Sequence, residues 1–340
     1  MNATPGYPDD FGGMLRHARE TLLQRLAAAG MGADAAGLPA FYVHLGGCFT
    51  AAATELFDEE PFRLPLHLLC PELPQEETAE DAVPELLCGR CRDVPVAVLR
   101  GERRLADGAP QWAVTFPTAL AAFCGVTNHI FVDTGMSLHP DLKAGHWAML
   151  TDFINGFSFS PVDGLHRLAP TPYADLSQLF SQHLNSELLN AMAGFGDAPM
   201  LTTFMGVPGF HVCTQAEARR HREDGADLVG HELVLHLMLA AAFDCKVSAM
   251  VLAAFQLLPA RPKTPLTRQE ALATAEFCTP QLLAGVKRAL ADIHEAQSGG
   301  IPECILPEAD ADDVIHQNIR KGASAGHSSP LKAFLRREES

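Results

Sequence analysis

His231, Glu232 and His236 are the residues whose types come closest to a catalytic or metal-binding motif. A helix-borne zinc site of the HExxH kind needs its two histidines four residues apart, on one face of the helix. Here the second histidine follows the first by five residues and leaves that face. The spacing excludes a site of this kind. Two alternatives remain: a new histidine cluster that includes His211, or ordinary buried histidines with hydrogen bonds.

A CxxC pair, Cys88 and Cys91, is the second feature that could do chemistry. The chain has no second CxxC and no histidine pair at zinc-ribbon spacing, so two thiols on a loop are favoured over a metal or redox site. The nine cysteines are an odd number, which is typical of reduced thiols in a cytoplasmic protein. We expect no metal and no cofactor.

The stretch 206–255 predicts the elements that would position such residues: loop, helix, strand, helix, strand. Residues 215–224 are polar, and Gly225 follows as a C′ glycine, which predicts a surface helix. Residues 233–243 are apolar almost all round and predict a helix packed on both sides. Residues 247–252 form a short apolar run typical of a strand in a parallel core. Together they predict a β-α-β element of a layered α/β domain.

The same stretch resembles a known family. The groups GVPGF (206–210), TQAE (214–217) and GADLVG (225–230) resemble, in order and spacing, the C-terminal signature of trimeric purine nucleoside phosphorylases and methylthioadenosine phosphorylases. Two further segments support it, VTFP (114–117) with CGV (124–126) and HPDLKAGH (139–146) through LTDFIN (150–155). The resemblance implies a three-layer α/β fold with a central mixed sheet flanked by helices.

The positions that would carry the family's chemistry differ from its pattern. The glutamate that recognises the purine ring falls on His211. The residues at the ribose and the phosphate fall on His231 and Glu232, so an anion replaces a hydroxyl and would repel phosphate. The asparagine that polarises the leaving purine falls on Phe255, which cannot donate a hydrogen bond. The histidine that precedes the C-terminal helix falls on Thr279.

The phosphate side of the resemblance is altered too. The first phosphate loop falls on Gly46 and lacks its serine hydroxyl. The family's arginine loop falls on 101–106, where a slip of one residue leaves Arg103 or Arg104 as the phosphate candidates. Asp133 replaces a neutral asparagine. Each new carboxylate would oppose binding of a dianion by about 1 kcal/mol or more at the dielectric of a pocket. We do not expect inorganic phosphate as a ligand.

Changes at the base, ribose, phosphate and leaving-group positions together favour a catalytically inactive relative that serves as a structural or regulatory subunit. The alternative is an active purine-nucleoside or methylthioadenosine phosphorylase, or an N-ribosyl hydrolase, with an altered site. In the first case the pocket wall, formed by Phe210, Phe255 and Phe159, would be smaller and more apolar than that of an active enzyme.

Three local features complete the expected frame. Residues 41–45 and 129–132 predict apolar strands, and the resemblance places a turn of the family at 132–137, after the second of them. Thr115, before Phe116 and a proline, predicts a turn from strand to helix.

Composition bounds the class of protein. The chain has 340 residues, of which 47% are hydrophobic and 19% charged, enough for one domain over 38–295 between extensions at 1–37 and 296–340. The net charge of −16 argues against nucleic acid and acidic membranes as partners. The longest apolar region, 233–258, is interrupted by charged residues and is too short on either side to cross a bilayer.

The expected partners are proteins. Residues 70–86 form an acidic insertion, and the C-terminal extension is expected to be ordered only on a partner. The resemblance implies a trimer, with an interface near Phe157 and Phe159, since exposed phenylalanines need cover. The location expected for such a protein is the cytoplasm.

Overall fold

The computed structural model describes residues 7–31, 38–74, 83–163, 165, 168–171, 173–209, 211–259 and 266–298. Contacts divide the chain into two units, residues 1–294 and 295–340. The second unit is described only over 295–298, at the end of the last helix. The C-terminal extension beyond residue 298 and residues 75–82 of the acidic insertion therefore lie outside the described residues.

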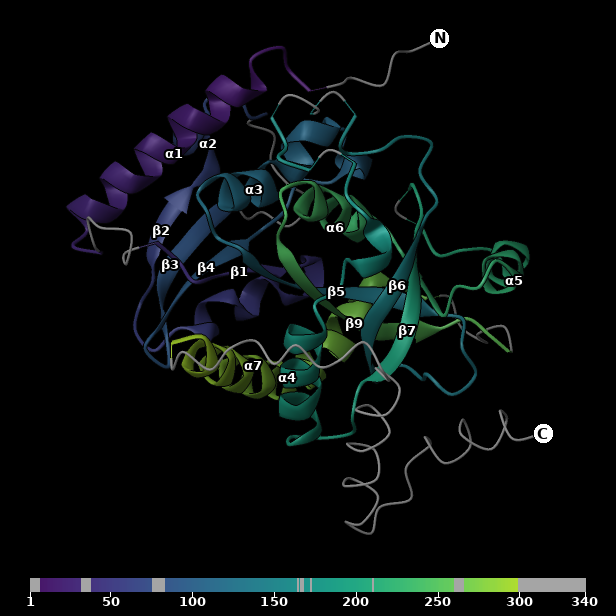
Figure 1. Ribbon diagram of the computed structural model, residues 1–340. Coiled ribbons are helices and arrows are strands. Elements are labelled where there is room, and N and C mark those ends of the chain that lie inside the picture. The colour runs from purple at the N-terminus through teal and green to yellow at the C-terminus, as the bar shows by residue number, and fades with distance from the viewer. Residues whose placement is uncertain are drawn as a thin grey trace. The chain divides into compact units, whose positions relative to one another are not determined.

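The strands of the first unit form one nine-stranded mixed sheet (Figure 1). Its order is β2-β3-β4-β1-β5-β8-β7-β6-β9, and β9 pairs in addition with β5, so the last five strands close into a ring. The strands are β1 Phe41–Leu45, β2 Phe62–Pro65, β3 Glu85–Cys91, β4 Val94–Arg100, β5 Asn128–Ser137, β6 Trp147–Asn155, β7 Met200–Gly206, β8 Leu228–Gly230 and β9 Lys246–Gln256.

The central strands follow from their sequences. β1 is buried at all five positions and pairs in parallel with both β4 and β5, as a continuous apolar run favours. Its expected bounds are confirmed. The turn expected over 132–137 is wrong, because β5 continues to Ser137. The chain instead takes a register shift against β9 between Gly135 and Met136, so the strand absorbs the irregularity without turning.

Helices cover both faces of the sheet, as the three-layer fold requires (Figure 1). One face is covered by α1, α3 and α6, and the other by η2, α4 and α7. The helical elements are α1 Phe11–Ala28, η2 Gly47–Leu56, α2 Leu66–Leu69, η3 Leu105–Asp107, α3 Gln111–Phe123, η4 Leu176–Gln178, α4 Gln182–Ala193, α5 Gln215–Glu223, α6 Leu233–Ala242 and α7 Arg268–Ser298.

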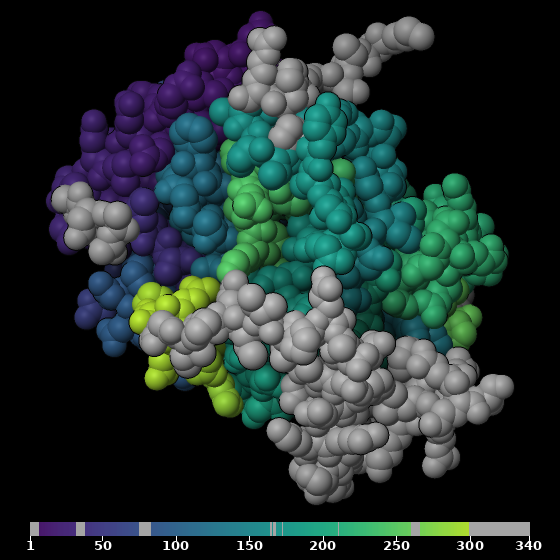
Figure 2. Space-filling view, viewed as in Figure 1, coloured from purple at the N-terminus to yellow at the C-terminus, as the bar shows by residue number. Residues whose placement is uncertain are grey.

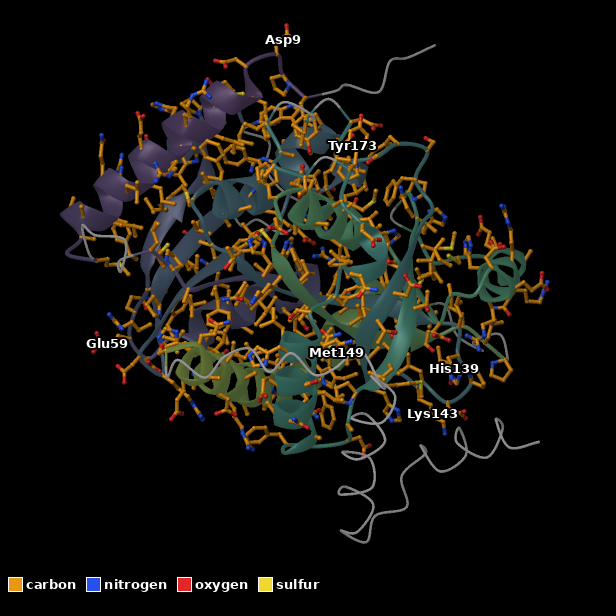
Figure 3. All side chains as sticks on the ribbon, viewed as in Figure 1. Asp9, Glu59, His139, Lys143, Met149 and Tyr173 are labelled. Atoms are coloured by element: carbon orange, nitrogen blue, oxygen red, sulfur yellow. The ribbon has the colours of Figure 1, made fainter. Side chains whose placement is uncertain are left out.

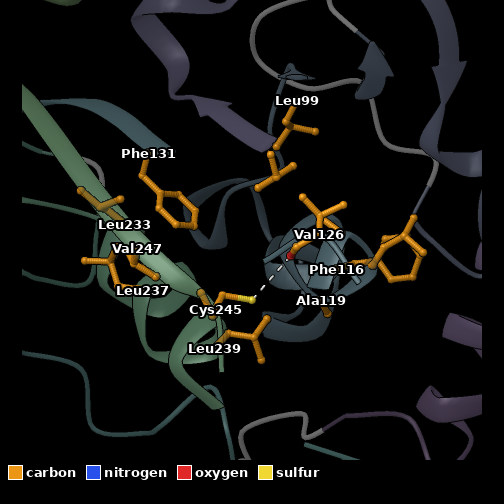
Figure 4. Close-up of a cluster of buried hydrophobic side chains, with 14 of the residues drawn as sticks. Leu99, Phe116, Ala119, Val126, Phe131, Leu233, Leu237, Leu239, Cys245 and Val247 are labelled. Atoms are coloured by element: carbon orange, nitrogen blue, oxygen red, sulfur yellow. Dashed lines mark hydrogen bonds between the residues drawn. The ribbon is translucent and has the colours of Figure 1, made fainter. Parts of the chain in front are cut away.

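The core on the first face joins α3 and α6 to the sheet (Figure 4). Phe116 of α3, Leu237 of α6 and Phe131 of β5 are all fully buried there. The turn expected at Thr115 is wrong: this residue lies inside α3, and its hydroxyl donates to the Gln111 carbonyl at 3.1 Å. The helix prevails because the segment is apolar on every side and lies between α1, α6 and the sheet.

The N-terminal residues are part of the same core. Phe11, Leu15 and Leu22 of α1 are buried in the cluster that contains the α3 and α6 side chains. The Phe11 and Phe116 rings meet edge to face with their centroids 6.4 Å apart. The described part of the N-terminal extension is thus a packed helix.

The second face holds a separate apolar cluster between the sheet and α4, α7 and η2. The Phe49 ring of η2 stacks on the Trp147 indole of β6 at 5.6 Å. Met149 in this layer is fully buried, whereas Tyr173 is 96% exposed; both are labelled in Figure 3.

The stretch 206–255 has the expected order of loop, α5, β8, α6 and β9. α5 begins with a capping box between Thr214 and Glu217, and Gly225 follows it at φ +102°. This polar helix stands at one flank of the surface (Figure 2). One expectation is wrong: β8 and β9 are not adjacent parallel strands, because both pair with β5, antiparallel and parallel respectively.

The CxxC pair is not on a loop. Cys88 and Cys91 belong to β3 and are buried. Burial raises the pKa of the Cys88 thiol to about 12 and that of Cys91 to about 11, far from the range of a reactive thiolate. Within the described residues, no helix is long and apolar enough to cross a membrane.

Candidate functional site

The candidate site lies where the ends of β1, β4 and β7 meet the start of α6. β1 and β4 are parallel neighbours, so the loops that follow them leave the sheet at the same edge. The end of β7 abuts α6 closely, since a Cβ on Gly206 would lie 3.0 Å from the His231 carbonyl oxygen. Hydrogen bonds between side chains and loop amides join these segments.

Glu102, in the loop after β4, is the central side chain. Its Oε2 lies 3.0 Å from His44 Nε2, and its Oε1 accepts the Gly47 N–H at 2.9 Å. A carboxylate only accepts hydrogen bonds, so the hydrogen of the first contact is on Nε2. Burial raises the pKa of Glu102, but the bonds from His44 and Gly47 outweigh it and hold the pKa below its usual value.

Glu232 is the second carboxylate. It is the N-cap residue of α6, yet its side chain does not cap that helix. Its Oε1 accepts the Leu105 N–H at 3.2 Å instead. Burial, reinforced by the negative charge of Glu102, raises the pKa of Glu232 to about 7. The resemblance implies a serine hydroxyl at this position. The chain has a carboxylate there, and this carboxylate bonds to the neighbouring loop.

The two arginine candidates are placed differently. Arg103 turns to the other side of its loop and donates to the Pro74 carbonyl at 2.8 and 3.3 Å. Arg104 is buried and pairs with Asp107 at 3.0 Å. Its positive charge also lowers the pKa of both glutamates. Arg104 is therefore the arginine that the fold places at the site.

Gly46 and Asp133 face each other across β1 and β5. The Gly46 N–H donates to the Val132 carbonyl at 2.7 Å. A Cβ on Gly46 would lie only 2.6 Å from Asp133 Oδ1, so a larger residue here would have to displace the Asp133 side chain. Asp133 also accepts its neighbour's Thr134 N–H at 2.7 Å. A third carboxylate thus lies beside the turn that holds Glu102.

The histidines divide into two groups. His236 is buried, bonds to the Thr118 hydroxyl at 2.8 Å, and meets the His44 ring edge to face at 4.5 Å. His231 lies nearer the surface, with Nδ1 3.4 Å from the Val207 carbonyl oxygen. His211 is exposed. Within the described residues, no group of histidines, cysteines and carboxylates could hold a metal ion.

Phe255 lies near the end of β9. It pairs with Met136 in the β5–β9 ladder and packs on the apolar cluster that includes Val207 and Cys213. These two residues flank the 208–212 loop. Phe210, the second expected wall residue, lies outside the described residues.

The interface near Phe157 and Phe159 was expected on the assumption that both rings are exposed, and this assumption does not hold for Phe157. Phe157 is buried within the chain, 8% exposed, and its ring meets that of the half-buried Phe159 at 5.4 Å. Thr279 does not precede the last helix as expected. It lies inside α7 and its hydroxyl donates to the Ala275 carbonyl at 2.8 Å.

The sequence reasoning missed Glu102, His44 and Thr118. An arginine-to-glutamate change in the aligned loop was the available signal for Glu102. Nothing in the sequence indicated its partners, which lie 55 and 58 positions earlier in the chain.

The arrangement can hold negative charge on Glu102 and can exchange a proton at Glu232 near neutral pH. It offers an incoming oxyanion two carboxylates, with the nearest loop amides already occupied.

Comparisons with known proteins agree with this fold. A profile of the phosphorylase superfamily matches residues 64–290. Purine nucleoside phosphorylase 1 of Bacillus subtilis is 27% identical over 172 residues, which are 50% of this chain and 63% of that protein. The purine nucleoside phosphorylase of Mycobacterium leprae is 29% identical over 165 residues, 48% of this chain and 57% of that protein. The chain thus spans less than two thirds of the length of these curated relatives.

A solved structure extends the likeness in fold. The purine nucleoside phosphorylase of Schistosoma mansoni in complex with inosine has a TM-score of 0.69 at 18% identity. The match covers 82% of this chain and 95% of that one. The layered arrangement of sheet and helices is therefore shared over most of the described chain.

Proposed function

The chain belongs to the phosphorylase superfamily, and from this premise we propose that it is a catalytically inactive, nucleoside-phosphorylase-like protein that acts as a structural or regulatory subunit. It is a distant relative of the purine nucleoside phosphorylases. The proposal includes the cytoplasmic location expected from the sequence.

Glu232 is the observation that carries the proposal. The resemblance gives this position a serine that contacts phosphate. Here a carboxylate bonds to the Leu105 N–H of the neighbouring loop at 3.2 Å and lies close enough to Glu102 to raise its pKa. Phosphate would meet two acidic side chains and would have to break the Leu105 contact. Phosphorolysis needs that dianion as its nucleophile, so the reaction is disfavoured at its first step.

Phe255 supports the same proposal from the leaving-group side. The resemblance gives this position an asparagine that donates a hydrogen bond to the purine. A phenyl ring packed against an apolar cluster cannot stabilise the negative charge that develops on the departing base.

The partner class remains proteins, either further copies of this chain in a trimer or another subunit. Phe157 is covered within the chain, so the support now comes from other exposed aromatic side chains. Tyr173 is 96% and Phe277 is 86% exposed, and large exposed aromatic surfaces commonly mark contacts between proteins.

A second candidate is an N-ribosyl hydrolase with rebuilt chemistry. One observation favours it: Glu232, which is half-buried, has a pKa of about 7, and this suits a general acid or base at neutral pH. Hydrolysis would use water and would not need the phosphate that the carboxylates oppose.

Purine release tests the two candidates together. Inosine, guanosine and methylthioadenosine are each incubated with the full chain, with and without inorganic phosphate, beside an active phosphorylase. The proposal expects no release above the blank in either condition. Phosphate-dependent release overturns it in favour of a phosphorylase. Release without phosphate that disappears in Glu232→Gln supports the hydrolase.

Light scattering tests the subunit role. We expect a defined oligomer, or a defined complex with a partner protein. A monomer at all concentrations that forms no complex in its native cell extract contradicts that role.

A further inference from the structure

The carboxylate of Glu102 is largely buried, with 19% of its side chain exposed, and lies against the first backbone amide after a glycine turn. Burying a carboxylate is costly unless donors surround it. Here the donors are His44 Nε2 at 3.0 Å and the Gly47 N–H at 2.9 Å, with the Arg104 guanidinium as a nearby charge. A buried ring nitrogen, a loop amide and a guanidinium are the groups that bind small oxyanions in proteins.

The anion that these donors contact is a side chain of the protein itself. Glu102 belongs to the loop after β4, whereas His44 and Gly47 flank the end of β1. The two loops are also tied from the other direction, where Glu232 accepts the Leu105 N–H. Each of the two loops therefore has a backbone N–H that donates to a glutamate from another segment.

The turn after β1 is held against β5. Gly46 lies close to Asp133 and donates to the Val132 carbonyl at 2.7 Å. The Gly47 N–H at the start of η2 points to an acceptor that is an anion. The donors are therefore arranged for negative charge, and Glu102 supplies that charge.

We propose that Glu102 is a built-in occupant of an anion site formed by His44, Gly47 and Arg104, and that its carboxylate, not a collapse of the loops, excludes small tetrahedral oxyanions such as inorganic phosphate. This inference rests on the proposed function, since it names the side chain that keeps phosphate out. A tethered carboxylate has a high effective concentration and does not dissociate, so an external anion competes poorly.

Removing the carboxylate should open the site. Glu102→Ala vacates both the charge and the volume, and Glu102→Gln removes the charge while keeping the size and an acceptor for the Gly47 N–H. Glu60→Ala is the matched control, because Glu60 is a largely exposed glutamate paired with Arg63 on the surface and its loss changes the net charge equally.

The measurement is titration calorimetry of the full chain with inorganic phosphate, repeated with sulfate, without any nucleoside. We expect no saturable binding by the unmodified protein or by Glu60→Ala. Glu102→Ala should bind phosphate saturably, at least about tenfold more tightly than the weakest affinity that the titration of the unmodified protein would have detected, since one nearby unit charge changes the affinity for a dianion by about that factor or more. Adding His44→Ala should abolish the gain.

Three outcomes overturn the inference: no gain in Glu102→Ala although its circular dichroism and thermal unfolding show a folded protein, equal binding by Glu60→Ala, or a gain that survives His44→Ala. If Glu102→Ala does not fold, Glu102→Ser, which also removes the charge and most of the volume, decides the question by the same criteria. The proposed function can fail separately. Phosphate-independent purine release by the unmodified protein would refute inactivity and leave the anion site as proposed, whereas a failed gain in a protein without turnover refutes only the anion site.

Discussion

α6 joins two regions that differ sharply over a few residues. From Leu233 to Ala242 it is buried almost throughout against α3 and the sheet, and its side chains are apolar apart from His236. One residue earlier, Glu232 is a carboxylate bonded to another loop. Packing over ten residues fixes where the helix lies, so the residue at its start can be acidic without moving the helix. The position of α6 is therefore set by packing, whereas the chemistry at its start is set by one side chain.

The largest effect is expected in the framework. Phe131→Ala removes a fully buried ring of β5 that packs between α3 and α6 (Figure 4), and should lower the free energy of unfolding by about 3–5 kcal/mol. Urea denaturation followed by circular dichroism measures it. Leu272→Ala on α7, which is 38% exposed, is the control and should change stability little. A loss below about 1 kcal/mol for Phe131→Ala would mean that this core does not fix the fold.

The second largest effect is expected at Glu232, where removing the negative charge should stabilise the protein. Folding raises the pKa of Glu232 from 4.5 to about 7. A raised pKa means that the contribution of this group is most favourable below pH 4.5 and is lost as the pH rises to about 7. Glu232→Gln does not titrate and keeps an acceptor for the Leu105 N–H. Relative to the unmodified protein, it should therefore gain up to about 3 kcal/mol between pH 4.5 and pH 8.

Thermal unfolding of both proteins from pH 5 to pH 8 measures this difference. Glu60→Gln, on the exposed side chain paired with Arg63, is the control and should show almost no pH-dependent difference. A difference in stability between Glu232→Gln and the unmodified protein that stays constant across this range would mean that the Glu232 carboxyl does not titrate there. The start of α6 would then differ less from the packed body of the helix than proposed.

The smallest effect is expected on the outer flank, away from both regions. Thr214→Ala removes the N-cap of α5, whose hydroxyl accepts the Glu217 N–H at 3.3 Å, and should cost about 1 kcal/mol. Hydrogen exchange of the α5 amides detects it as local opening. Glu217→Gln keeps an acceptor for the Thr214 N–H and should open the helix less. Equal protection in Thr214→Ala and the unmodified protein would show that packing of Ala218, not the cap, holds this helix.

Much of the framework was predictable because its signals are local. The bounds of β1 follow from five consecutive buried residues, and α5 follows from its cap and from Gly225. The errors arose where tertiary contacts override local pattern. Thr115 reads as a turn before a proline, yet it is held in α3 between α1 and α6. Residues 132–137 read as a glycine turn, yet pairing with β8 and β9 keeps them extended.

The sequence by itself determined the family frame, the acidic side chain at Glu232 and the apolar side chain at Phe255, since residue types and spacing carry that information directly. Only the tertiary structure decided which loop amides these charges would meet. Arg103 and Arg104 are adjacent in sequence, but one turns to Pro74 and the other to the site. Glu102 reaches Gly47 and His44 across more than fifty residues of chain. A hydrogen bond depends on distance and direction within a few tenths of an ångström, and that geometry is set by the packing of strands and helices that the loop sequences do not contain.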